Sequence, residues 1–245
     1  MAFTDIITRL SPTKLRSFHE DGFVTLGKFI ATEEIERAQK DLDDLLAKIE
    51  LVDSYNLRCH RQDDVLQQEN RLKCCEPVID LSATCRRLAL ADGTFATLNA
   101  LLGESASLFK DKIMFLLPGF KGSSIYQDFV PEESFPTFVT VLIAIDSLDE
   151  KSGRLEIFPT VKTSSTADTI QSVYLNLNAG DIVVFKGFMP YRLSANQSST
   201  PRRLLSLGYN PMSTGDEKRD HYYHEFHDWL GKRFEEHGRA PVYFR

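Results

Sequence analysis

The sequence of 245 residues lacks any long run of apolar side chains. A helix that spans a membrane needs about 18 or more consecutive apolar residues, and no segment reaches that length. The segment Met1–Leu10 also lacks a basic start followed by an apolar stretch, as a secretory signal would have. We therefore expect no membrane span and no signal peptide, and we predict a cytoplasmic protein.

An excess of positive charge is also missing. The chain has 29 Lys and Arg against 35 Asp and Glu, which gives a formal net charge of −6. Proteins whose main partner is nucleic acid or an anionic membrane usually carry a basic surface. Neither partner is expected for this chain.

Cysteines are few and are not spaced for a metal site. The four residues Cys59, Cys74, Cys75 and Cys85 contain no C-x-x-C pair. Two adjacent cysteines are also poorly placed to form a disulfide with each other. The pattern favours reduced thiols in a cytosolic protein over a disulfide framework or a zinc site.

The chain has no internal repeat, no low-complexity tract and no linker rich in Pro, Gly or Ser. With 42% hydrophobic residues it can bury a sizeable core, and β-rich proteins of this length are often single domains. We predict one domain over residues 1–245. Residues 51–90 are polar and weakly patterned, which is typical of a lid or insert.

Helix signals stand at the start of the chain. Ser11 is a helix-capping residue followed by Pro12, and Gly22 supplies a stop, which predicts a helix over 13–20. Residues 23–26 then have the composition of a strand.

Two further helices follow from apolar spacing. Thr32 precedes an acidic first turn, and apolar residues recur at helical intervals as far as Ile49. The segment Asp216–His237 is also expected to be helical, and three of its residues share a face that would dock it: Phe226, Leu230 and Phe234.

The middle of the chain is rich in strand signals. Short β-prone runs occupy residues 113–117, 138–145, 154–158, 172–177, 181–185 and 204–209. Turn clusters such as Pro118-Gly119 and 151–153 separate them. Many short strands with this punctuation predict a mainly β protein, a barrel or double-sheet jelly roll flanked by helices.

Five blocks in this order carry a resemblance to a known family. They read FHEDGFVTL at 18–26, LLPGFKGSSIYQDF at 116–129, VTVLIAIDSLDEKSGRLEIFP at 139–159, LNAGDIVVF at 177–185 and PYRLSANQSSTPRRLLSLGY at 190–209. Over about residues 15–211 the chain resembles the phytanoyl-CoA dioxygenase family of iron(II)/2-oxoglutarate oxygenases. The resemblance implies a double-stranded β-helix, a cupin-like jelly roll buttressed by N- and C-terminal helices.

The resemblance also locates the family's functional residues. Its H-x-D iron motif falls on Tyr126-Gln127-Asp128, and its distal histidine falls on Tyr191. Its 2-oxoglutarate-binding arginine falls on Arg202, with Arg203 as a near alternative. The carboxylate position of the iron triad is thus kept, while both histidine positions hold tyrosine.

These substitutions change the expected chemistry. Ferrous oxygenases bind iron through a face of three ligands and leave the other positions open. A phenol has an ordinary pKa of about 10 and binds poorly until it loses its proton, and a phenolate favours ferric iron. We therefore expect no metal and no cofactor on this chain, with Tyr126, Asp128 and Tyr191 as degenerate triad positions.

The surviving charged residues leave alternatives open. Asp128 can bind a metal or be hydrogen-bonded within the old pocket. Arg202 can hold the carboxylate of 2-oxoglutarate, as guanidinium groups do well, or it can pair with Asp128. Asp181 and Asn196 are expected to stabilise turns.

The histidines give no competing site. His221, His224 and His227 share part of one helix face, but His221 and His227 diverge by about 120° around a helix of 3.6 residues per turn. A histidine-rich surface is favoured over a metal site there.

Three hypotheses about function follow. The first is a non-catalytic subunit that stabilises, or completes the pocket of, an active homologous oxygenase. Family members in fungal natural-product pathways, such as meroterpenoid biosynthesis, often form dimers. The partner would then be a heterodimeric homologue that carries Fe(II) and 2-oxoglutarate, or a second copy of this chain.

The second hypothesis is a metal-independent isomerase or cyclase. Tyr126, Tyr191 and Asp128 would act as acid and base if the pocket shifted their pKa values toward neutrality. The third is an active oxygenase with unusual iron ligands, such as His60.

Overall fold

The computed structural model describes residues 10–47, 59–64, 69–127, 134–159, 172–216 and 218–237. Side chains within 59–71, and several beyond residue 224 in the last helix, lie outside that description. The helices are α1 (Pro12–Asp21), α2 (Thr32–Ala47), α3 (Ala83–Ala89), α4 (Asp92–Leu102) and α5 (Lys218–His237), with a 3₁₀ turn at Met212–Thr214.

Within these described ranges, ten strands form two sheets. They are β1 (Phe23–Lys28), β2 (Cys59–Asp64), β3 (Glu69–Cys75), β4 (Ala106–Leu116), β5 (Val139–Ala144), β6 (Leu155–Ile157), β7 (Val173–Leu175), β8 (Asp181–Lys186), β9 (Tyr191–Leu193) and β10 (Arg202–Pro211). The large sheet has the order β1-β8-β5-β10-β4-β3-β2, and the small one has the order β7-β6-β9. All the pairings are antiparallel, which confirms the predicted mainly β, double-sheet fold.

The first helix begins and ends where its sequence signals lie. The Ser11 side chain accepts a hydrogen bond from the Lys14 amide at 3.2 Å, and Gly22 ends the helix with a left-handed φ of 80°. A side chain at Gly22 would also meet the terminal methyl of Met189 at 2.6 Å. Glycine therefore serves both the turn and the close approach of the β8–β9 connection.

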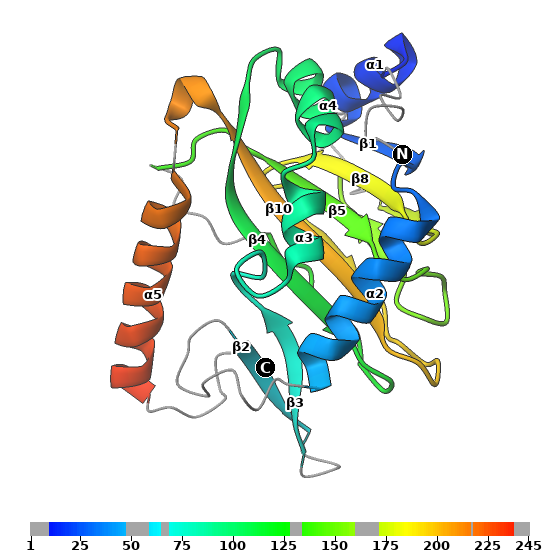
Figure 1. Cartoon of the computed structure of the whole chain (residues 1–245), viewed down its shortest axis with the longest axis vertical. Coiled ribbons are helices and arrows are strands. Elements are labelled where there is room, and N and C mark those ends of the chain that lie inside the picture. The colour runs from blue at the N-terminus through cyan, green and yellow to red at the C-terminus, as the bar shows by residue number, and fades with distance from the viewer. Residues whose placement is uncertain are drawn as a thin grey trace, which may run out of the picture.

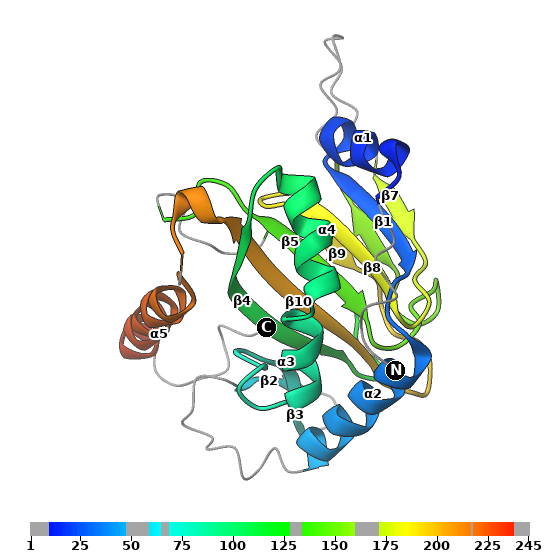
Figure 2. The same ribbon diagram turned by 45° about the horizontal axis from the view of Figure 1, so that its top comes forward.

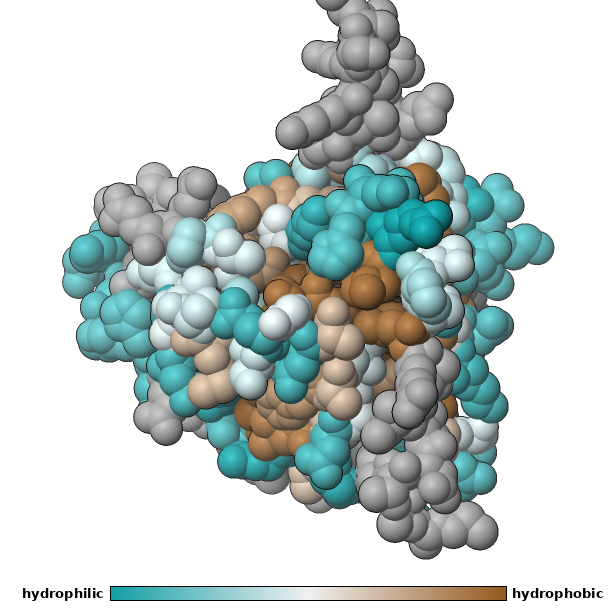
Figure 3. Space-filling model, turned by 90° about the horizontal axis from the view of Figure 1, so that it is seen from above, coloured by the Kyte–Doolittle hydropathy of each residue, from teal (hydrophilic) through white to brown (hydrophobic). Residues whose placement is uncertain are grey.

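Helices cover one face of the large sheet. In Figure 1 and Figure 2, α2, α3 and α4 lie across this face. The largest apolar cluster fills the space between them and includes Leu42, Leu88 and Leu98 from the helices and Leu205 and Leu207 from β10. Figure 3 shows the molecule from above, at the end that is uppermost in Figure 1. Apolar side chains gather on this end among hydrophilic ones. Leu15, Phe95 and Leu102 are partly buried side chains that pack against the largest cluster.

A second apolar cluster lies between the two sheets. It joins Leu142, Val183 and Leu204 of the large sheet to Leu155, Ile157 and Leu193 of the small one. Alternate residues of a strand point to opposite faces, so each central strand serves both clusters. The interior of the jelly roll is thus largely packed with side chains.

Part of the predicted lid region belongs to the body of the fold. Within residues 51–90, β3 pairs with β4 at Cys74–Met114 and Cys75–Ile113, and α3 buries Cys85 and Leu88 completely. Weak patterning misled the prediction here because β3 and α3 are short and bury only a few side chains each. Residues 51–58 and 65–68 lie outside the described residues.

Three of the four cysteines can be placed. Cys74, Cys75 and Cys85 are buried thiols that are not in disulfides, and burial raises the pKa of Cys85 to about 12. The expectation of reduced thiols is confirmed for these three. No helix among the described residues has the length and apolarity to cross a membrane.

The helix α5 is attached to the free side of β4. β3 pairs with β4 at only two positions, and the backbone of Asp111 lies beyond them. The Tyr223 hydroxyl accepts from the Asp111 amide at 2.7 Å and donates to its carbonyl at 2.8 Å. Burial raises the pKa of Tyr223 well above its ordinary value, so the hydroxyl keeps the proton it donates. One side chain thereby takes the place of a neighbouring strand.

The change Tyr223→Phe should therefore destabilise the protein by about 1–3 kcal/mol, because it leaves two buried backbone groups unsatisfied. Urea unfolding followed by circular dichroism measures this. The control His224→Ala alters a side chain that is 74% exposed on the same helix and should change stability by less than about 0.5 kcal/mol. Equal effects of the two changes would contradict the role given to Tyr223.

Candidate functional site

The two tyrosines at the predicted histidine positions lie side by side. Tyr126 and Tyr191 form an antiparallel bridge in which each amide donates to the other's carbonyl at 3.0 Å. Their ring centroids are 4.4 Å apart, with ring planes inclined by 51°. The sequence separates the two residues by 65 positions, and the backbone bridge brings their side chains together.

The two rings differ in their surroundings. Tyr191 is completely buried, and its ring lies 5.2 Å from that of Phe185 on β8. Tyr126 is half-buried, and its hydroxyl lies 3.7 Å from the sulfur of Met114 on β4. The pair therefore lies between the two sheets, on the inner face of the jelly roll.

Gln127, the middle residue of the predicted motif, fixes the position of the segment that carries Tyr126. The Gln127 side-chain amide donates a short hydrogen bond to the carbonyl of Phe188. Phe188 has a positive φ of 61°, which is uncommon for a non-glycine residue, and its ring packs edge-on against Phe138. Gln127 thus ties the Tyr126 segment to the turn that precedes Tyr191. Asp128, the third predicted position, lies outside the described residues.

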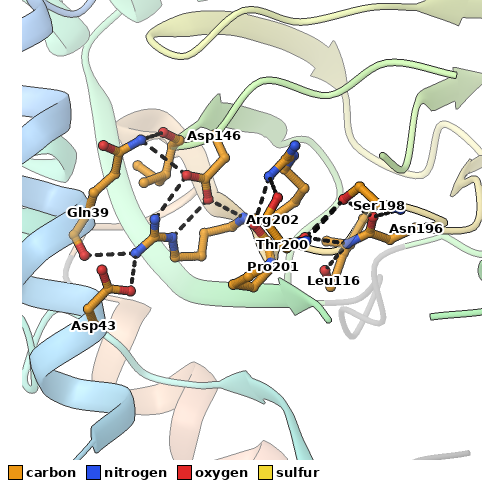
Figure 4. A network of polar contacts seen from close by, with 11 residues as sticks. Gln39, Asp43, Leu116, Asp146, Asn196, Ser198, Thr200, Pro201 and Arg202 are labelled. Carbon is orange, nitrogen blue, oxygen red and sulfur yellow. Dashed lines mark hydrogen bonds and ion pairs between the residues drawn. The ribbon is translucent and has the colours of Figure 1, made fainter. Parts of the chain in front are cut away.

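Arg202 stands at the first position of β10, opposite Leu116. Its Nη1 donates to Thr200 Oγ1 at 2.5 Å and to the Pro201 carbonyl at 3.1 Å (Figure 4). Its Nε is buried and has no hydrogen-bond partner among the described residues. The guanidinium is therefore held by its own loop on one side and keeps a donor unused on the other.

Arg203, the alternative arginine, points to the opposite face of the sheet. Its Nε and Nη2 donate to the two oxygens of Asp146 at 2.8 and 2.9 Å, and its Nη1 donates to Asp43 at 2.6 Å and to the Gln39 carbonyl at 2.7 Å (Figure 4). Burial lowers the pKa of Arg203, but the bonds to Asp146 and Asp43 outweigh it and raise the pKa above its ordinary value. Arg203 joins α2 to the sheet and is not available to a ligand between the sheets.

The two expected turn residues have that role. Asp181 accepts from the Asn178 amide at 2.8 Å. Asn196 is fully buried, accepts from the Ser198 amide at 3.0 Å, and donates to the carbonyls of Leu116 at 2.7 Å and Thr200 at 3.0 Å (Figure 4). Asn196 thereby shapes the loop that positions Arg202.

The donors that the structure describes do not fit ferrous iron. The residues at two of the three expected ligand positions are phenols, which are poor ligands while protonated. Over the described ranges, no group of three or more His, Cys, Asp or Glu side chains is placed to hold a metal ion. The exposed His221 and His224 fit the expected histidine-rich surface.

The arginine position fits an anion better than the tyrosine positions fit a metal. The buried Nε of Arg202 is a polar donor without an acceptor among the described residues, and guanidinium pairs strongly with carboxylates. The predicted role of Arg202 toward the 2-oxoglutarate carboxylate remains a prediction.

Two residues of the site were not expected from sequence. Met114 contacts Tyr126, and Phe185 packs against Tyr191. Both lie within predicted strands, and alternation along those strands was the signal that could have placed them on the inner face.

Comparisons with known proteins identify the family of this chain. The model of the phytanoyl-CoA dioxygenase family matches residues 18–204. A methylphosphonate hydroxylase of Gimesia maris is 24% identical over 228 residues, which cover 88% of this chain and 86% of the relative. A 2-aminoethylphosphonate dioxygenase of an uncultured bacterium is 29% identical over 168 residues, covering 62% and 64% of the two chains.

Solved structures share the fold. EctD from S. alaskensis, solved with bound Fe, has a TM-score of 0.70 at 18% identity and covers 87% of this chain and 80% of its own. The alpha-ketoglutarate-dependent epimerase SnoN from nogalamycin biosynthesis has a TM-score of 0.66 at 18% identity and covers 85% of both chains. The predicted cupin-like jelly roll is confirmed.

The two adjacent arginines should differ sharply in their effect on stability. Arg203→Met leaves the buried Asp146 carboxylate without its bidentate partner, so it should cost about 3–5 kcal/mol in the free energy of unfolding. The matched change Arg202→Met removes only bonds within a loop and should cost at most about 1 kcal/mol. Equilibrium urea denaturation of both variants tests this, and similar losses would show that Arg202 also supports the fold.

Proposed function

This chain belongs to the phytanoyl-CoA dioxygenase family, and from that premise we propose that it is a non-catalytic subunit of an active homologous oxygenase. In this role it stabilises the partner or completes the partner's pocket. The observation that carries the proposal is the Tyr126–Tyr191 pair, which sets two phenols side by side where a ferrous site needs imidazoles.

The surroundings of the pair support this role. Both tyrosines are held by the backbone bridge, and apolar residues such as Phe185 and Met114 pack around them. A scaffold with its core intact can keep its binding surfaces after its ligand set has changed, because function resides in the site and not in the fold. The Fe(II) and 2-oxoglutarate of the reaction would then belong to the partner.

The setting we propose is natural-product biosynthesis. Support comes from the neighbour SnoN, whose description places it in nogalamycin biosynthesis, and from a relative described as dioxygenase lolE1 of Epichloe uncinata. Both likenesses are distant, so they support a class of pathway and no particular substrate.

Reconstitution tests the subunit role. Co-purification of this chain with a homologous oxygenase encoded beside it should give a heterodimer by native mass. The oxygenase should turn over more substrate, or lose activity more slowly, with this chain than alone. A monodisperse monomer that alters neither the activity nor the half-life of the oxygenase would contradict the proposal.

A matched variant separates this role from chemistry at the tyrosines. The double change Tyr126→Phe with Tyr191→Phe keeps both rings and removes both hydroxyls, so a non-catalytic subunit should support its partner as before. A thermal melt confirms that the variant is folded. If the folded variant no longer supports turnover, the hydroxyls act in the reaction and a metal-independent acid–base role takes precedence.

Histidine at both tyrosine positions should create an iron site. With Tyr126→His and Tyr191→His together, we expect stoichiometric Fe(II) binding, because Asp128 would complete a two-histidine, one-carboxylate face. Anaerobic titration with metal analysis measures this, with the unchanged chain as the control that binds little. A folded double variant that binds no more iron than the parent would show that the pocket no longer has room for a metal.

A further inference from the structure

The outer face of the small sheet carries a row of polar side chains. Leu155 and Ile157 of β6 belong to the apolar cluster between the two sheets. Alternation therefore turns Glu156, which lies between them, to the opposite face. In the register of the strands, Glu156 lies opposite Tyr174 of β7 and Arg192 of β9. The row thus crosses all three strands of the small sheet.

The helices that cover the large sheet lie far from this row. The helices α2, α3 and α4 pack on one face of the large sheet, and the small sheet packs against the other face (Figure 2). The outer face of the small sheet therefore lies on the opposite side of the molecule from these three helices. In keeping with this, the Tyr174 side chain is 47% exposed.

The acidic residue of the row already has a partner. Glu156 is buried and accepts a short hydrogen bond from Arg192 Nε. Burial raises the pKa of Glu156, but hydrogen bonds from Ser172 and Arg192 outweigh burial and leave this pKa below its ordinary value. The carboxylate is therefore charged at neutral pH, and the charge of Arg192 offsets it.

The neighbouring arginine, Arg154, has no such partner. Its guanidinium carbon lies 4.1 Å from the centre of the Tyr174 ring. Its Nε is buried and has no hydrogen-bond acceptor among the described residues, and none of the ion pairs between described residues includes Arg154. A guanidinium held against an aromatic ring presents a rigid fork of donors that matches a carboxylate. Arg154 is thus arranged to bind an acidic group from outside the chain.

Exposed apolar side chains stand at both margins of the small sheet. Four large hydrophobic side chains are exposed in the described part of the chain, and two of them are Tyr174 and Ile125, at 47% and 51%. Tyr174 lies on the marginal strand β7, and Ile125 directly precedes Tyr126, which is bridged to Tyr191 of β9. Aromatic and arginine side chains together are typical of the residues that contribute most to protein interfaces.

The charges of this face indicate the chemistry of its partner. The face carries two arginines, Arg154 and Arg192, against the one carboxylate of Glu156, so one positive charge is left over. A symmetric pair of copies of this chain would bring two such positive faces together, which repulsion between like charges disfavours. A different chain that presents a carboxylate is complementary to Arg154.

We propose that this face, formed by Arg154, Tyr174 and Arg192 with Ile125 at its margin, is the docking surface for the homologous oxygenase, and that an aspartate or glutamate of the oxygenase binds Arg154. The inference rests on the proposed subunit role and names the surface that this role uses. Tyr174 supports the guanidinium and adds apolar contact, while the pair of Glu156 with Arg192 fixes the row beside it.

Calorimetric titration of this chain with the oxygenase encoded beside it tests the surface. Arg154→Met keeps the length of the side chain but removes its charge and donors, so the dissociation constant should rise about tenfold or more. Tyr174→Ala removes the ring that supports the guanidinium and should weaken binding to a similar extent. The matched control Arg37→Met alters an arginine on α2 whose side chain is 65% exposed, and it should leave the affinity unchanged.

Ionic strength gives a second readout that a general loss of structure would not produce. Salt screens an ion pair at the surface, so raising the salt concentration should weaken binding of the parent chain. The affinity of Arg154→Met should depend less on salt than that of the parent. Arg154→Lys keeps the charge but not the planar fork, so it should bind more weakly than the parent and keep the salt dependence.

Three results would overturn the docking surface. If Arg154→Met and Tyr174→Ala bind the oxygenase as tightly as the parent, the heterodimer forms elsewhere and the subunit role still stands. If the parent alone forms a dimer that Arg154→Met dissociates, the occupant is a second copy. If the parent does not bind the oxygenase at all, the subunit role fails together with this surface. Thermal melts establish that each variant is folded, and Tyr174→Ala decides the matter if Arg154→Met does not fold.

Discussion

Alternation along β10 is the constraint on which the rest of the structure depends. Arg203, Leu205 and Leu207 face the helices, while Arg202, Leu204 and Ser206 face the small sheet. Because the side-chain period of a strand is two, a shift of one residue would exchange the two sets. The buried pair of Arg203 with Asp146 opposes such a shift, since it would leave charges in an apolar interior. The strand thus contributes side chains both to the helical layer and to the space between the two sheets, and its register determines which side chains lie on each face.

The chemistry of the space between the two sheets follows from the side chains that line it. Around Tyr191 this space is apolar and packed, and Tyr191 is joined to Tyr126 by backbone hydrogen bonds. Toward Lys112, which is half-buried, and Ser206, which is buried, the lining becomes polar. We propose that this chain uses its fold for partnership rather than for oxygen chemistry.

Much of the architecture could be predicted because its signals are local. The cap at Ser11, the stop at Gly22 and the turn at Asp181 lie where the sequence placed them. Within the large sheet, β1, β4, β5, β8 and β10 were found, although β4 and β10 run further than expected. The strands β2 and β3 were not predicted, because their segment was assigned to a lid or insert. The helices α3 and α4 were not predicted, because short buried helices have no clear polar face. β9 was missed because three residues are too few to show alternation.

Sequence alone determined the family, the identity of the residues at the iron positions and the presence of two candidate arginines. It could not decide which arginine faces the small sheet, because adjacent strand residues differ only in the face they take, and register is set by pairing across strands. Likewise, Lys112 and Ser206 are 94 positions apart and show no motif. Only the antiparallel pairing of β4 with β10 places them opposite each other on one inner face. Long-range strand pairing is a property of the folded chain, so it was the tertiary structure that brought these residues together.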